Sequence, residues 1–204
     1  MKYVFVGAHP DDIEYSCGGT ILRLIDEGHE VYIVLMTGGE SSPNCSERER
    51  RTEQMKAVRL AKIKDITMLN YHDGEIVTNA ESVREISDIL ETVKPDFVIT
   101  HYPNDSHQDH RATAQIVKSA TRRKCNLLYY DSYSSIDFNP NLYVDITPYI
   151  EGKRNLLKCF KSQIDKYTNR NIDFIKKSLL ISELNGYESR TKYAEGFCVD
   201  TYMI

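Results

Sequence analysis

The sequence predicts an α/β protein of the Rossmann-like, doubly wound class, with a mostly parallel sheet and helices on both faces. Short apolar segments of strand length alternate with longer segments whose apolar residues recur at helical spacing. This alternation is typical of βαβ units, in which a helix carries the chain back so that successive strands run parallel. The 204 residues contain no repeat and no linker, so we expect a single domain over residues 1–204.

The first predicted strand, residues 3–7, leads into a dense group of charged residues. One histidine and three carboxylates follow Gly7 within the six residues from 9 to 14, namely His9, Asp11, Asp12 and Glu14. In open α/β sheets the chemistry collects at such strand ends. Repulsion between carboxylates costs free energy unless a proton or a cation offsets it. Because histidine and aspartate are both zinc ligands, this stretch indicates a divalent metal site.

The later elements follow from apolar periodicity and from residues that start or stop helices. Gly28 ends the first helix, Ser46 and Glu49 form a capping box before the second, and Pro95 stops the third. Further strands are predicted at 30–36, 65–69, 96–100, 127–130 and 142–145, with an edge strand at 195–204. Helices are predicted at 18–27, 47–61, 80–93, 110–123, 149–163 and 172–184.

A second polar cluster follows the predicted strand 96–100. The loop 101–110 contains three of the six histidines of the chain, His101, His107 and His110. In the doubly wound strand order 3-2-1-4-5, the first and fourth strands are neighbours at the point where the winding reverses. The two His/Asp clusters are therefore expected to meet at one crevice.

These residues match a known family. His9-Pro10-Asp11-Asp12, with His107-Gln108-Asp109-His110 downstream, resembles the motifs of the LmbE/PIG-L-type zinc-dependent deacetylases. Those enzymes remove acyl groups from N-acylated amino sugars, including N-acetylglucosaminyl conjugates. Because Ile13 separates Glu14 from the aspartate pair, Glu14 is expected to support the site and not to be catalytic. Weaker matches extend the resemblance over most of the chain: Thr37 to Glu40, Arg51, Glu53, Asp73-Gly74, Ser162-Gln163 and Tyr193 to Phe197.

The resemblance implies that His9, Asp12 and His110 ligate Zn²⁺. Two imidazoles and one carboxylate leave the fourth position of a tetrahedral zinc site for water, as catalytic zinc requires. Zinc lowers the pKa of that water to about 7, which makes hydroxide available at neutral pH. The same ligands accept Fe²⁺ or Co²⁺ in place of zinc.

The resemblance also implies roles for five neighbouring residues. Asp11 is expected to be the general base, which then passes its proton to the leaving amine. Protonated His107 is expected to stabilise the oxyanion, and Asp109 to orient His107. Arg51 and Glu40 are assigned to substrate binding.

Alternative interpretations stay open at this point. The aspartate pair could cap the first helix, and His29, His72 and His101 are interpreted as structural residues. A Rossmann-like module that binds a nucleotide or S-adenosylmethionine without hydrolysis would explain the fold but not the histidines, and no G-x-G-x-x-G or Walker pattern is present. A zinc amidase for another small N-acylated metabolite would use the same residues.

Composition and charge limit which binding partners and which cellular compartment are expected. The net charge of −4 argues against nucleic-acid binding, and no apolar run reaches the length of a membrane span. Five cysteines, an odd number without a C-x-x-C pair, are expected to be reduced thiols. The chain enters its first strand at once, so we expect no signal peptide and a cytoplasmic protein. The expected partner is a small N-acylated sugar, and related enzymes are often homo-oligomers.

Overall fold

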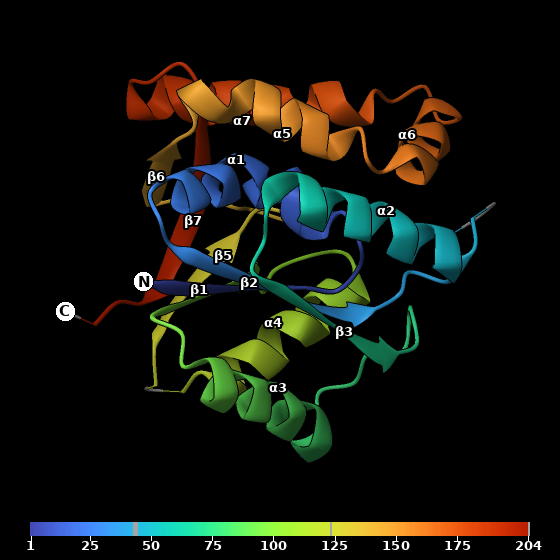
Figure 1. The fold of residues 1–204 in the computed structure, drawn as a ribbon, viewed down its shortest axis with the longest axis vertical. Helices are drawn as coiled ribbons and strands as arrows, with labels where there is room; N and C mark the ends of the chain where they lie inside the picture. Colours follow the sequence, from blue (N-terminus) through green and yellow to red (C-terminus); the bar gives the residue numbers. More distant parts are fainter. Residues whose placement is uncertain (43–44, 123, 204) are drawn as a thin grey trace.

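A seven-stranded sheet with the order β3-β2-β1-β4-β5-β7-β6 forms the centre of the computed structural model, which describes residues 1–42, 45–122 and 124–203 (Figure 1). The five strands β1 to β5 run parallel, whereas β7 is antiparallel to both β5 and β6. The predicted doubly wound fold and its 3-2-1-4-5 core are confirmed. The strands are β1 (Lys2–Gly7), β2 (Glu30–Thr37), β3 (Asp65–Tyr71), β4 (Phe97–His101), β5 (Asn126–Tyr130), β6 (Leu142–Asp145) and β7 (Ala194–Thr201).

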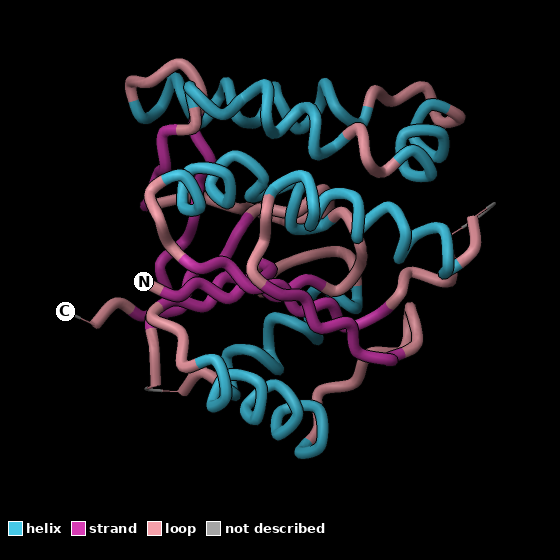
Figure 2. The backbone as a smooth tube through the Cα atoms, viewed as in Figure 1, coloured by secondary structure: helices cyan, strands magenta, loops and turns pink. Residues whose placement is uncertain are grey.

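Helices cover both faces of the sheet, as Figure 2 shows. On one face lie α1 (Asp12–Asp26) and α2 (Glu47–Ala61), and on the other lie α3 (Ala80–Val93) and α4 (Gln108–Ala120). Three further helices form an outer layer beyond α1 and α2: α5 (Ile150–Leu157), α6 (Lys161–Thr168) and α7 (Phe174–Ser189). A 3₁₀ turn at Thr147–Tyr149 leads into α5. Among the described residues, every helix is too short or too polar to cross a bilayer.

The central strands are buried on both faces. Successive residues of β1 alternate between two cores, with Phe5 packed in the cluster of α1 and α2 and Val6 in that of α3 and α4. Both side chains are fully buried, and burial of a large apolar side chain stabilises a fold by about 1.5–3 kcal/mol. This two-sided burial explains why the strands read as continuous apolar runs.

Tertiary contacts make two helix boundaries differ from those predicted from the sequence. Helix α1 begins at Asp12, six residues before its predicted start at position 18. A Cβ atom at Gly19 would lie 2.6 Å from Ile146, so this glycine permits close packing inside the helix and does not open it. The predicted helix 149–163 is two helices, because the Glu53 carboxylate accepts hydrogen bonds from the Ser162 backbone N–H (2.8 Å) and hydroxyl (2.6 Å) and anchors a new helix there.

Two other elements also differ from the prediction, one in its place in the sheet and one in its ends. β7 lies between β5 and β6, so the predicted edge strand near the C-terminus is an interior strand and β6 is the edge. Helix α4 begins at Gln108, with His107 as its N-cap, and ends at Ala120. Position 123, the end predicted for this helix, lies outside the described residues.

The sheet brings the carboxyl ends of β1 and β4 side by side. The two strands pair in parallel, with Tyr3 opposite Phe97 and Phe5 opposite Ile99. The loops that follow Gly7 and His101 therefore leave the sheet at one place, where its winding reverses.

Candidate active site

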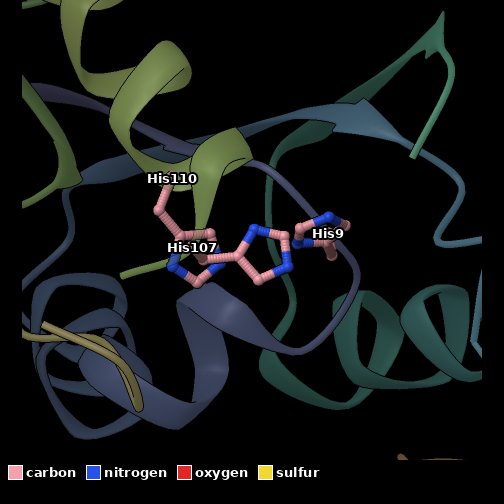
Figure 3. Close-up of side chains that lie close together, drawn as sticks. All are labelled: His9, His107 and His110. Atoms are coloured by element: carbon pink, nitrogen blue, oxygen red, sulfur yellow. The ribbon is translucent and has the colours of Figure 1, made fainter. Parts of the chain in front are cut away.

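The loops after β1 and β4 bring His9, Asp12 and His110 into contact. One Asp12 oxygen, Oδ2, lies 3.3 Å from His9 Nδ1, and the other, Oδ1, lies 3.5 Å from His110 Nε2. Ring nitrogens of His9, His107 and His110 lie within 4.8 Å of one another, and Figure 3 shows these three imidazoles side by side. Three imidazoles and the Asp12 carboxylate thus lie next to one another in the segments that follow β1 and β4.

Carboxylates hold the opposite ring nitrogens of the two predicted histidine ligands. His9 Nε2 lies 3.1 Å from both Asp73 Oδ1 and Asp109 Oδ2. His110 Nδ1 lies 3.1 Å from Asp105 Oδ2. A carboxylate on one nitrogen fixes the ring and its tautomer and makes the other nitrogen a better ligand. In both rings the nitrogen that remains is the one that faces Asp12.

His101, which sequence reasoning left as a structural residue, lies directly behind this centre. Its ring is fully buried, stacks on His110 with 3.9 Å between centroids, and places Nε2 3.2 Å from Asp12 Oδ2. Nε2 also accepts a hydrogen bond from the Ala8 backbone N–H at 3.0 Å. Burial and the positive charge of His110 lower the pKa of His101 to about 4, so the ring is neutral.

The charges of the cluster fit a divalent cation. Burial opposes protonation of His9, but hydrogen bonds to Asp109, Asp12 and Asp73 outweigh it and raise the pKa of His9 well above its usual range. Burial likewise opposes protonation of His110, but the carboxylates of Asp12 and Asp105 outweigh it and raise the pKa of His110 to about 9. Without a metal ion these two protons offset the carboxylates. Metal binding displaces protons from its ligands, so a cation at this point would take over their role.

Asp11 stands beside the cluster in a strained backbone conformation. Its φ of 91° lies in the left-handed region, which costs a non-glycine residue about 1–3 kcal/mol and is found mostly at functional sites. The side chain makes no hydrogen bond to the start of α1, so it does not cap that helix. Instead Oδ1 accepts from Arg50 Nη2 at 2.9 Å. Burial, opposed by Arg50, raises the pKa of Asp11 to about 6.

Two buried side chains support the Asp11 backbone. Its N–H donates to Gln54 Oε1 at 3.3 Å, and Gln54 Nε2 donates to Glu14 Oε1 at 2.6 Å. Burial raises the pKa of Glu14 to about 7. Glu14 therefore contacts Asp11 only through Gln54, in line with the supporting role expected for it.

The contact between His107 and Asp109 differs from the expected one. The Asp109 carboxylate accepts from the Gly74 N–H at 2.7 Å and contacts His9, not His107. His107 Nδ1 accepts from the Asp109 backbone N–H at 3.2 Å, so a neutral ring carries its proton on Nε2. Burial and the positive charges of His110 and His9 lower the pKa of His107, which favours this neutral form.

A cavity of about 430 Å³ opens over the cluster. Its floor contains His9, Asp12 and His110, and its far wall comes from the outer helical layer and the loop after β5. Aromatic rings form part of that wall: Tyr167 stacks on Phe174 (5.2 Å between centroids) and packs at a tilt against Tyr133 (4.8 Å). No local motif predicted this wall from the sequence. It includes Gln163, Lys166 and Tyr167 of α6, and Arg170 two residues beyond the end of that helix.

Comparison with known proteins identifies the family. The PIG-L family model, described as GlcNAc-PI de-N-acetylase, matches residues 4–121, which is more than half of the chain. The chain belongs to the PIG-L family. It is 30% identical over 166 residues to the uncharacterized deacetylase YaiS of Escherichia coli, a match that covers 77% of this chain and 89% of YaiS.

Two further proteins resemble this PIG-L family member. A probable N-acetyl-α-D-glucosaminyl L-malate deacetylase 2 of Bacillus anthracis is 34% identical over 130 residues, which cover 57% of this chain and 58% of that protein. The structure of an N,N′-diacetylchitobiose deacetylase from Pyrococcus horikoshii superposes with a TM-score of 0.83 at 27% identity. That superposition covers 97% of this chain and 83% of the other.

The two residues assigned to substrate binding do not line the cavity of this family member. Arg51 pairs with Glu47 at 2.6 Å on the outer side of α2, whereas the adjacent Arg50 is buried and lines the cavity. Glu40 accepts from the Asp73 N–H at 2.7 Å and so holds the loop that carries Asp73. The side chain of His72 is 80% exposed. It reaches the site only through its contact with Glu40.

Proposed function

We propose that this PIG-L family member is a zinc-dependent hydrolase that removes the N-acetyl group from a small N-acetylglucosamine conjugate. The observation that carries this proposal is the cluster of His9, Asp12 and His110 beside Asp11 at the floor of an open cavity. The relatives named as deacetylases of N-acetylglucosaminyl L-malate and of diacetylchitobiose support the substrate class.

The residues that would hold the ion are His9 through Nδ1, Asp12 through its carboxylate and His110 through Nε2. These are nitrogen and oxygen donors of the kind that zinc prefers, and their other polar atoms are already held by Asp73, Asp105 and Asp109. When bound, zinc supplies Lewis acidity that polarises an amide carbonyl and makes water acidic at neutral pH.

Asp11 acts as the general base in this proposal. Arg50 holds Oδ1, and a carboxyl group with a pKa of about 6 is ionised at neutral pH yet basic enough to accept a proton. Asp11 removes the proton from the water that attacks the acetamide carbonyl carbon. It then donates that proton to the nitrogen as the C–N bond breaks, which releases acetate and the free amine.

His107 stabilises the negative charge that develops on the carbonyl oxygen. Its Nδ1 is occupied by the Asp109 backbone N–H, so Nε2–H of the neutral ring is the donor for that oxygen. This role needs no protonated imidazole, in contrast to the expectation from sequence. Asp109 acts on His9 through its carboxylate and reaches His107 only through its backbone.

The aromatic wall binds the sugar. Ligand pockets are lined by aromatic surface with a few polar groups that fix orientation, and Tyr133 and Tyr167 present such a surface opposite the cluster. We further propose that the enzyme works in the cytoplasm, since none of its five cysteines forms a disulfide.

The test combines metal analysis with a substrate screen. Zinc-loaded protein should release amine from a panel of N-acetylated sugars, and His9→Ala, Asp12→Ala and His110→Ala should each lose zinc and turnover together. His29→Ala is the matched control, because His29 lies beyond the cavity lining, next to Glu27 and the N-terminus. Unchanged zinc content and turnover in all three variants would refute the proposal. If the enzyme hydrolyses other acyl amides but no acetylated sugar, the proposed substrate class is wrong and the enzyme is an amidase for another metabolite.

A further inference from the structure

At the C-terminal end of α6 the cavity wall carries two cations, Lys166 and Arg170, that have no anionic partner among the described residues. Lys166 lies in the last turn of α6 and Arg170 in the turn that follows the helix, and both side chains line the cavity. Lys166 is partly buried and lies over the Tyr167 ring, with Nζ 5.6 Å from its centroid. Arg170 is exposed at the rim.

The nearby carboxylates are already engaged. Asp11 is bound by Arg50 at 2.9 Å, and Asp73 contacts His9 at 3.1 Å. Across residues 1–42, 45–122 and 124–203, no carboxylate forms an ion pair with Lys166 or Arg170. On the solvent side of the same helix, by contrast, Lys161 is paired with Asp165 at 2.5 Å.

Leaving these two cations together is unfavourable without an anion. Burial, together with the positive charges of Arg50 and Arg170, lowers the pKa of Lys166, although Asp11 attracts it. Like charges that share a site destabilise one another, and an anion placed between them removes that cost. The cavity therefore offers a favourable place for a negative charge next to Lys166 and Arg170.

The wall is also fixed in place. Glu53 holds the start of α6 through Ser162, and Gln163 Nε2 donates to Ser42 Oγ at 3.1 Å across the cavity mouth. A helix anchored at two points presents its side chains in a constant geometry, which is what recognition of a ligand requires. The whole wall lies beyond residue 121, outside the part of the chain that matches the family model.

We propose that the substrate carries a carboxylate or phosphate group on the part distal to its acetamide, and that Lys166 and Arg170 bind this group. Arginine provides a planar fork of donors for such an anion, and lysine a compact charge. The inference rests on the proposed deacetylase function and adds to it the chemical class of the substrate.

The test compares three substrates that share the N-acetylglucosamine unit. N-acetylglucosaminyl L-malate carries carboxylates, N-acetylglucosamine 1-phosphate carries a phosphate, and N,N′-diacetylchitobiose is neutral. A hydrogen bond to a charged group changes a binding constant by about ten-fold or more. We expect the parent enzyme to prefer at least one anionic substrate over the neutral one by about ten-fold or more in kcat/KM. The two anionic arms show which acid is recognised.

The variant Lys166→Gln/Arg170→Gln should lose that preference by about ten-fold or more, through a higher KM for the anionic substrate. Lys161→Gln, on the same helix but outside the cavity, should keep the preference. Equal losses on anionic and neutral substrates, or a parent enzyme without preference, would overturn the proposal and leave the deacetylase function standing.

If no substrate is turned over, the anion site is tested by binding. Calorimetry then measures the Kd of zinc-loaded protein for N-acetylglucosamine 1-phosphate and for N-acetylglucosaminyl L-malate. Absence of turnover would count against the deacetylase function alone. A ten-fold or larger rise in Kd in the double variant, with Lys161→Gln unchanged, would then support the anion site. Equal Kd values in the parent and the double variant for both compounds would refute it.

Discussion

Replacement of Asp105 by asparagine should weaken zinc binding without removing any of the three proposed zinc ligands. Asp105 is 2% exposed, and its two oxygens have different partners. Oδ1 accepts from the His107 N–H at 2.7 Å and from Ser134 Oγ at 2.6 Å, whereas Oδ2 faces His110 Nδ1 at 3.1 Å. In Asp105→Asn the amide oxygen keeps the two donors at Oδ1, which places the NH₂ group against His110.

This change reverses the hydrogen bond to His110. The carboxylate accepts from Nδ1–H and leaves the lone pair of Nε2 facing Asp12, whereas an amide N–H must donate to Nδ1 and moves the ring proton to Nε2. A protonated Nε2 cannot ligate a metal. Loss of a carboxylate behind a histidine ligand typically costs 10–100-fold in metal affinity, about 1.4–2.8 kcal/mol.

The measurement is the zinc Kd by competition with a chelator, together with the melting temperature of the zinc-free protein. Ser132→Ala is the control, because it removes a hydroxyl that donates to Asp105 Oδ2 but keeps the carboxylate. Asp73→Asn should weaken zinc binding less, since Asp109 shares its contact with His9 Nε2. Zinc affinity in Asp105→Asn within about three-fold of the parent, a change of less than 1 kcal/mol, would refute the reasoning.

Three further predictions follow from the site and the core. Asp11→Asn should retain its zinc and lose about 10²–10⁴ in kcat, as for a general base; near-parent turnover would show that Asp11 is only structural. Arg51→Ala should change KM by less than about two-fold, because Arg51 lies outside the cavity, and a ten-fold rise in KM would restore its predicted role in substrate binding. Lys153→Met should lower the free energy of unfolding by about 3–5 kcal/mol in urea titrations, because it leaves the Glu195 carboxylate, 2.7 Å from Lys153 Nζ and equally buried, without its cation. The exposed Lys161→Met should leave the urea midpoint close to that of the parent, and equal losses for both lysines would contradict this account.

The sequence by itself determined the sheet and the position of the His/Asp cluster. Apolar periodicity distinguishes strands buried on both faces from amphipathic helices, and the doubly wound order follows from their alternation. Because parallel strands end at one edge, the polar residues after β1 and β4 had to meet, and His9, Asp12 and His110 are in contact as expected. The motifs that carry the family resemblance lie in these same two loops.

Tertiary structure decided which groups surround that cluster. One step along a helix turns a side chain by about 100°, so only the packing of α2 could select Arg50 for the cavity and leave Arg51 outside it. Asp73 reaches His9 from a loop 64 residues away, and its approach is set by the pairing of β2 and β3. Periodicity shows which face of an element is buried but not what lies opposite that face. For this reason the sequence did not indicate that Lys166 and Arg170 line the cavity, which follows from the packing of the outer helices over it.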